Sequence, residues 1–181
     1  ATVEGHKNRF KIRVRFYDDR PESPLFLEIK RRDSQVIQKQ RAAVKRSCAD
    51  RLLAGEWLTR ADLVVDDEKN FRAMYNFCEL CQKINARPTA YTSYMREGYE
   101  PPDSNWQRVT FDRHLRAGPY RGSIDISELE RWAQPELQGI VLELKFTDRY
   151  PDWMHDLVES FDLRRTSMPK YVECVTLLYD S

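Results

Sequence analysis

Lysines and arginines recur at every second position in several short segments of this sequence. Side chains two residues apart lie on the same face of a β-strand, so each segment would gather its cations on one face. Neighbouring cations on a sheet repel one another unless an anion neutralises them, and a curved sheet lined in this way is suited to a chain of phosphate groups. The cations that fall on expected strands are Lys11, Arg13, Arg15, Lys30, Arg32, Lys39, Arg41, Arg96, Arg108 and Lys145.

Few carboxylates share these faces, chiefly Glu28, Asp112 and Glu143. A divalent metal that bridges phosphate oxygens prefers hard oxygen ligands, which makes Glu28 and Glu143 candidate metal ligands. The alternative is ion pairing with neighbouring lysines, and the two roles do not exclude each other. An exposed sheet face commonly carries both signs of charge, so for any single strand an ordinary solvent-facing surface is the favoured interpretation. The strands favour an anion site only as a set, because a merely soluble face would mix the signs more evenly.

Standard phosphate-binding and nucleophile motifs do not occur in the sequence. It has neither G-x-x-x-x-G-K-[ST] nor G-x-G-x-x-G, and it contains 6 glycines in all. The histidines, His6, His114 and His155, belong to no Ser-His-Asp or Cys-His arrangement and are interpreted as surface or capping residues. Phosphoryl transfer by positioning and electrostatics requires no covalent nucleophile, so this result leaves such chemistry open.

The cysteines are Cys48, Cys78, Cys81 and Cys174. Cys78 and Cys81 form a single C-x-x-C inside a helical pattern, without the second pair or the histidines that a zinc site needs. A redox pair is the alternative, but packing of small thiols in a helical core is favoured. Free thiols fit a reducing compartment, so the expected location is cytoplasmic, with the cytoplasmic face of a membrane as a narrower form of that expectation.

Length and composition are typical of a soluble globular domain. The chain has 181 residues, of which 41% are hydrophobic and 33% charged, and its net charge is +1. Proteins that coat nucleic acid or an anionic membrane usually carry a clear positive excess, and the aromatic residues here do not interleave with the basic ones. No nucleic-acid partner is therefore expected. No stretch approaches the roughly 20 apolar residues of a transmembrane helix.

Alternating and helical patterns predict the elements that must position these side chains. Strict alternation of apolar and charged residues predicts strands over 8–17, 25–32 and 34–44, and their tight spacing indicates an antiparallel meander. The middle of the chain changes character. Apolar residues at steps of three and four predict helices over 48–58 and 66–85.

The second half of the chain returns to alternation and then ends in helical patterns. The stretch 118–139 is rich in turn residues and is expected to hold one short strand and one short helical piece. Helices are expected to begin at Pro151 and to cover 169–179. The expected strands are 88–99, 106–115 and 140–146.

Several short motifs, in order along the whole chain, resemble the vacuolar transporter chaperone (VTC) domain. That family consists of polyphosphate polymerases within the triphosphate tunnel metalloenzyme superfamily. Each motif alone is weak, but the set in register is fairly specific and covers 1–181 as one domain. The motifs are K-I-R-V-R-F-Y-D at 11–18, L-E-I-K at 27–30, K-Q-R at 39–41, Y-M-R at 94–96, R-V-T-F-D at 108–112, V-L-E-L-K at 141–145 and P-K-Y at 169–171.

The resemblance implies an α+β fold, an antiparallel β-barrel tunnel flanked by helices. It implies transfer of the ATP γ-phosphate to a growing polyphosphate chain with Mn²⁺ or Mg²⁺, so the implied partners are ATP and inorganic polyphosphate. A membrane-protein partner is compatible with the family connection. Two alternatives stay open: a tripolyphosphatase or nucleoside triphosphatase of the same fold, and a non-catalytic module that binds polyphosphate.

The resemblance also implies roles for individual residues. Glu143 would be the metal ligand, and Lys170, which the strand pattern does not select, would match a basic residue near the end of the family's domain. Further substrate contacts are expected from Lys11, Glu28, Arg41 and Lys145. The implied catalytic residues, which would grip phosphates and stabilise charge on the transferring group, are Arg13, Arg15, Lys30, Lys39, Arg96 and Arg108.

This sequence departs from the family pattern at both ends. The family begins with further strands that carry a lysine, acidic residues and a segment close to S-L-Y-F-D, and nothing here matches them. The chain is therefore expected to begin after those strands. Near the other end, Pro169 stands where the family often has Ser, and Ser167 stands where some members have a second basic residue. The C-terminal phosphate contact is expected to differ in part.

Overall fold

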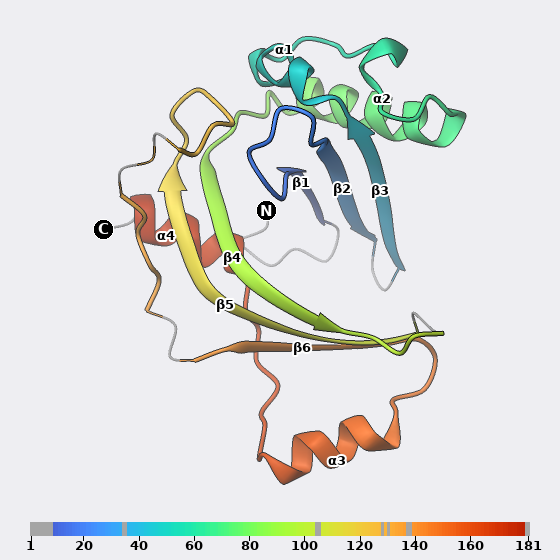
Figure 1. Cartoon of the computed structure of the whole chain (residues 1–181), viewed down its shortest axis with the longest axis vertical. Helices are drawn as coiled ribbons and strands as arrows, with labels where there is room; N and C mark the ends of the chain where they lie inside the picture. The colour runs from blue at the N-terminus through green and yellow to red at the C-terminus, as the bar shows by residue number, and fades with distance from the viewer. Residues whose placement is uncertain are drawn as a thin grey trace. The chain divides into compact units, whose positions relative to one another are not determined.

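The computed structural model of this chain describes residues 9–33, 36–103, 106–127, 129, 131–136 and 139–179. In these residues the fold is α+β, with two three-stranded antiparallel sheets and four α-helices (Figure 1). The chain divides into two compact units. Unit 1 comprises Ala1–Pro88 and Tyr120–Glu128, and unit 2 comprises Thr89–Pro119 and Leu129–Ser181.

Unit 1 contains an antiparallel meander of β1 (Arg9–Arg15), β2 (Leu25–Asp33) and β3 (Val36–Val44), as the alternation predicts. The first strand is shorter than expected, because the ladder between β1 and β2 stops at the pair Arg15 and Phe26. Phe16 and Tyr17 already belong to the connection to β2, which holds two prolines, and so have no partner strand. Asn8 and Ser34, at the edges of the expected strands, lie outside the described residues.

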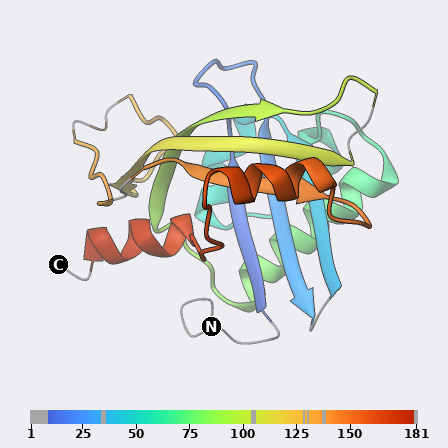
Figure 2. The same cartoon turned by 90° about the horizontal axis from the view of Figure 1, so that it is seen from below.

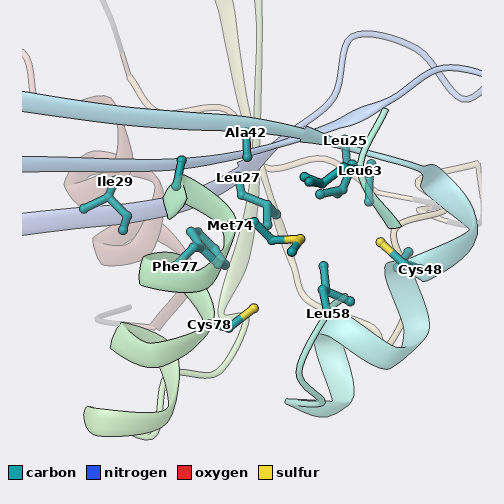
Figure 3. Packing of buried hydrophobic residues seen from close by; sticks show 13 residues of the cluster. Leu25, Leu27, Ile29, Ala42, Cys48, Leu58, Leu63, Met74, Phe77 and Cys78 are labelled. Carbon is teal, nitrogen blue, oxygen red and sulfur yellow. The ribbon is translucent and has the colours of Figure 1, made fainter. Parts of the chain in front are cut away.

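The core of unit 1 lies between one face of this sheet and the helices that follow it. These are the short α1 (Ala49–Ala54) and the long α2 (Glu68–Lys83), which packs on β2 and β3. Figure 3 shows Met74 and Phe77 on the side of α2 that faces Leu27. Each fully buried side chain of this size contributes roughly 1.5–3 kcal/mol. The buried cluster comprises Leu25, Leu27, Ile29, Ala42, Val44, Cys48, Ala49, Leu58, Leu63, Ala73, Met74, Phe77 and Cys78.

The helix expected over 48–58 ends early, at Ala54. Gly55 follows it in the left-handed conformation, with φ of 87°, and its N–H donates to the carbonyls of Arg51 and Leu52. This geometry stops a helix and is most accessible to glycine. The prediction of helix over 56–58 was therefore wrong, although Leu58 still reaches the core.

All cysteines of the described residues carry free thiols, and the preference for core packing is confirmed. Cys48, Cys78 and Cys174 are buried and Cys81 is half-buried. Burial raises the pKa of the Cys48 and Cys81 thiols to about 11. These thiols therefore stay protonated at neutral pH, which is unlike a reactive redox cysteine.

Unit 2 contains β4 (Ala90–Tyr99), β5 (Gln107–Pro119) and β6 (Val141–Phe146), with β5 in the centre. Helix α4 (Lys170–Tyr179) packs on β4 and β5. Helix α3 (Asp152–Ser160) runs beside β6 (Figures 1 and 2). The indole nitrogen of Trp153 donates to Gln107 Oε1 at 2.8 Å, which ties α3 to β5.

Strand β5 continues to Pro119, past the expected end at Leu115, and contains a β-bulge. Ser93 pairs with Arg116 but Met95 pairs with Arg113, so β5 holds one extra residue, and His114 there has φ of 54°. The buried positions change from even numbers to odd at this point. A simple alternating pattern breaks at this point, so it does not predict the continuation of the strand to Pro119.

Beyond the end of β5 at Pro119, the described residues of the stretch 118–139 contain only an isolated bridge, of Ala133 with Ala117 on β5. The short helical piece expected there was wrong for those residues, because they form bends and turns instead. Across the described part of the chain, every helix is too short or too polar to cross a membrane.

Candidate functional site

The face of the β1–β2–β3 sheet opposite the core carries the expected site residues of unit 1. Because the apolar positions of each strand turn to the helices, the alternate positions must turn away from them. We call this surface the β1–β3 basic face. It consists of Lys11, Arg13, Arg15, Glu28, Lys30, Lys39 and Arg41.

One row of this face contains only lysines. Lys30 is the direct partner of Lys11 on β1 and of Lys39 on β3. Neighbouring strands lie about 4.8 Å apart, and like charges at directly opposed positions destabilise a sheet by roughly 0.2–1 kcal/mol per pair. A bound polyanion across this row would turn that repulsion into attraction.

The next row alternates in sign. Glu28 accepts a hydrogen bond from Arg13 Nε, and its other oxygen lies 3.6 Å from Arg41 Nε. Its side chain is 16% exposed, while both arginines reach solvent. Glu28 therefore neutralises part of the positive charge of this face, while both guanidinium groups stay about half exposed.

Aromatic rings hold the arginines at the end of the same face. The Arg41 guanidinium lies 3.8 Å from the centre of the Phe26 ring, and that of Arg15 lies 5.8 Å from the Tyr17 ring. The hydrogen bond with Arg15 is the largest influence on Tyr17 and lowers the pKa of its hydroxyl. Such stacking orients a guanidinium while leaving edge donors for an anion.

In unit 2, the expected site residues share one face of the β4–β5–β6 sheet and the start of α4. The register aligns Arg96 with Asp112, Thr110 with Glu143, and Arg108 with Lys145. We call this surface the β4–β6 charged face. It consists of Arg96, Arg108, Asp112, Glu143 and Lys145 from the strands and Lys170 from α4.

Asp112 is at the centre of this face, beneath two cations. Arg96 donates from Nε to Oδ1 and from Nη2 to Oδ2, each at 2.6 Å, and Lys170 Nζ lies 2.9 Å from Oδ2. The carboxylate is 1% exposed. Burial is the largest single influence and raises its pKa, but the hydrogen bonds and charges of Arg96 and Lys170 outweigh burial, so the pKa lies below its ordinary value.

The Tyr94 ring completes this cluster. The Arg96 guanidinium carbon lies 5.3 Å from the ring centre, and Lys170 Nζ lies 5.5 Å from it. A cavity of about 420 Å³ adjoins the cluster, lined by Tyr94, Asp112 and Lys170 together with residues of the bulge and the start of β6. The sequence pattern had not indicated Tyr94, although its place two residues before Arg96 puts both side chains on one face.

Glu143 lies at the solvent edge of the same face. One carboxylate oxygen is 3.5 Å from Arg96 Nη2 and the other is 3.3 Å from Lys145 Nζ, and the side chain is 41% exposed. Arg108 pairs instead with Glu100, whose oxygen accepts from its Nε at 2.8 Å. The structure thus brings Arg96, Lys170 and Glu143 together.

The carboxylates fit a metal only in part. No group of three metal-ligating side chains occurs among the described residues, so they offer no all-protein cage. Mg²⁺ commonly binds through one or two carboxylates, several waters and the phosphates of its substrate. Glu143 fits that mode because it reaches solvent, whereas Asp112 is enclosed by its two cations.

The described histidines agree with their interpretation as surface residues. His114 is exposed in the bulge, and His155 on α3 faces Glu159 at 3.5 Å. His6 lies outside the described residues.

Comparison with known families matches residues 1–179 to the family described as VTC domain. Comparison with curated proteins finds no match. The family match covers almost the whole chain, including every residue of the two charged faces.

Proposed function

Because the chain belongs to the VTC domain family, we propose that it is a polyphosphate polymerase. Membership supports a role connected with polyphosphate in general. In the proposed reaction, the terminal oxygen of a polyphosphate chain forms a bond to the γ-phosphorus of ATP, and the bond from that phosphorus to the β-phosphate oxygen breaks. The products are ADP and a chain longer by one unit.

The single observation that carries this proposal is the row formed by Lys11, Lys30 and Lys39. Three cations in one row across neighbouring strands are suited to a linear anion that touches all three strands. Arginines on both faces would serve as fixed donors for phosphate oxygens, because a guanidinium can bind two of them at once.

The remaining residues would stabilise charge on the transferring group. Arg96 and Lys170 are both held by the buried Asp112 carboxylate and keep part of their side chains exposed, so they present fixed positive charge to a phosphate group. Glu143 would hold Mn²⁺ or Mg²⁺ together with phosphate oxygens, and that metal would neutralise phosphate charge. Arg13, Arg15 and Arg108 would contribute further phosphate contacts.

We also propose the tunnel that the resemblance implies. The described strands form two three-stranded sheets and no closed barrel. We further propose a cytoplasmic location and a membrane-protein partner that receives the product. A hydrolase of the same fold would use the same cations but pass the phosphoryl group to water.

One assay tests the activity and separates these functions. The protein is incubated with ATP and Mn²⁺, and polyphosphate and orthophosphate are both measured. Chains longer than the substrate support the polymerase, orthophosphate alone overturns it in favour of the hydrolase, and binding without turnover favours a non-catalytic module.

A matched pair of variants tests the metal site. We expect Glu143→Gln to abolish activity without unfolding the protein, because it removes the exposed carboxylate beside Arg96. Glu159→Gln on α3 changes the charge equally, away from the charged face, and should leave activity unchanged. Full activity of the Glu143 variant would show that the metal assignment is wrong.

A further inference from the structure

Asp112 differs from every other carboxylate of the two charged faces in being almost fully enclosed. With 1% of its side chain exposed and both oxygens occupied by Arg96 and Lys170, it has almost no surface left for a substrate, even at the edge of the adjoining cavity. Its neighbours can contact a substrate, because Arg96 and Lys170 retain 32% and 19% exposure. Any effect of Asp112 on an anion must therefore act through these two cations.

The contacts fix both cations in position. A bidentate pair through Nε and Nη2 sets the plane of the Arg96 guanidinium, which a single ion pair would not do. The same carboxylate reaches Lys170, which belongs to α4 and not to the sheet. Asp112 on β5 thus joins a cation of β4 to a cation of a helix that follows much later in the sequence.

We propose that Asp112 is a positioning residue, which holds Arg96 and Lys170 together as one preorganised anion-binding pair. The inference rests on the proposed function in taking a phosphate chain as the anion. Holding two long side chains in place before binding removes the conformational cost that each would otherwise add, and this cost is about 2- to 10-fold in affinity per side chain.

Two roles of Asp112, balancing charge and positioning the cations, predict opposite effects on anion binding when its charge is removed. Asp112→Asn keeps the shape of the side chain and makes the cluster more positive. If Asp112 only balanced charge, the variant would bind an anion more tightly. If it positions the cations, the variant binds less tightly despite the added positive charge.

The test measures binding of inorganic tripolyphosphate to the whole protein by calorimetry. We expect about 10-fold weaker binding for Asp112→Asn and no change for Asp156→Asn, which changes the charge equally at an exposed position on α3. Unchanged or tighter binding by Asp112→Asn would overturn the proposal.

A second variant separates position from charge and covers the case in which Asp112→Asn does not fold. Asp112→Glu keeps the charge but moves the carboxylate by one methylene, so we expect weaker binding here too. In an Arg96→Gln, Lys170→Gln background, Asp112→Asn should cause no further loss. A full further loss in that background would mean that Asp112 acts independently of both cations and would contradict the proposal.

A measurement without ligand distinguishes this proposal from the proposed function. Nuclear magnetic resonance of arginine Nε–H groups should show Arg96 as a protected, ordered signal in the original protein and as an exchanging one in Asp112→Asn. An equally ordered signal in the variant overturns the positioning role. If the original protein binds no tripolyphosphate, the proposed function fails while the Arg96 signal still decides whether Asp112 positions it.

Discussion

Lys30 and Lys39 occupy directly opposed positions on β2 and β3, on the face that turns away from the core. Lys11 extends the same row on β1. Lysines at directly opposed positions repel each other, and an anion bound across the row would relieve that repulsion.

Neutralising one lysine of this row should raise the stability of the fold and weaken the binding of an anion. We expect Lys39→Gln to raise the free energy of unfolding by about 0.5 kcal/mol at low salt, because it removes one repulsive pair, and to weaken tripolyphosphate binding. Urea unfolding and calorimetry measure the two effects. Both should shrink at high salt. Lys69→Gln on α2 is the control, and an equal effect there would attribute both changes to net charge alone.

Glu28 should behave in the opposite way to Asp112 when neutralised. It lies between two arginines that reach solvent. It therefore offsets their charge but does not fix them in a buried cluster as Asp112 does with its two cations. We expect Glu28→Gln to lower the free energy of unfolding by about 1 kcal/mol and to tighten tripolyphosphate binding a few-fold. Weaker binding would instead mean that Glu28 contacts the substrate or its metal.

The lowered pKa of Asp112 gives a pH signature. A carboxyl whose pKa is lower in the folded protein stabilises the fold above the unfolded value of about 3.9, and this contribution is lost as pH falls through the folded value. We expect the original protein to exceed Asp112→Asn in free energy of unfolding by a constant amount near neutrality.

That difference should shrink as the pH falls below about 4. Urea unfolding across this range measures the difference, with Asp156→Asn at an exposed position of α3 as the control. A gap between the original protein and Asp112→Asn that persists at the lowest pH would contradict a charged Asp112 in the folded state.

Thr110 offers a test of the interior of the charged face. It is 2% exposed, and its hydroxyl has no hydrogen-bond partner among the described residues. Valine has nearly the same shape without the hydroxyl, so we expect Thr110→Val to leave the free energy of unfolding unchanged or raise it by about 1 kcal/mol. Thr176→Val on the exposed side of α4 is the control. A clear loss of stability would reveal a partner such as an ordered water.

Alternation predicted the sheets and their faces well, because each strand of unit 1 needs one apolar side for the core. The same rule could not predict that Asp112 is buried, since a charged residue on a charged face is expected to be exposed. Its burial depends on Lys170, which long-range folding brings from α4. Family resemblance selected Lys170, but pattern alone could not. Gly55 shows a local limit of the same kind, where backbone conformation ended a helix that apolar spacing would have continued.

The extra residue at His114 shifts the alternation of buried and exposed positions along β5 by one residue. Upstream of it, even-numbered positions such as Thr110 and Asp112 are buried, and downstream the odd-numbered Leu115 and Ala117 are. If another sequence is aligned to β5 with an error of one residue at this point, its buried positions are matched to exposed ones. The residue types on the two sides of the error still alternate, so the alignment itself does not reveal the mistake. An alignment of β5 with a strand that lacks the bulge should therefore place its one-residue gap at His114.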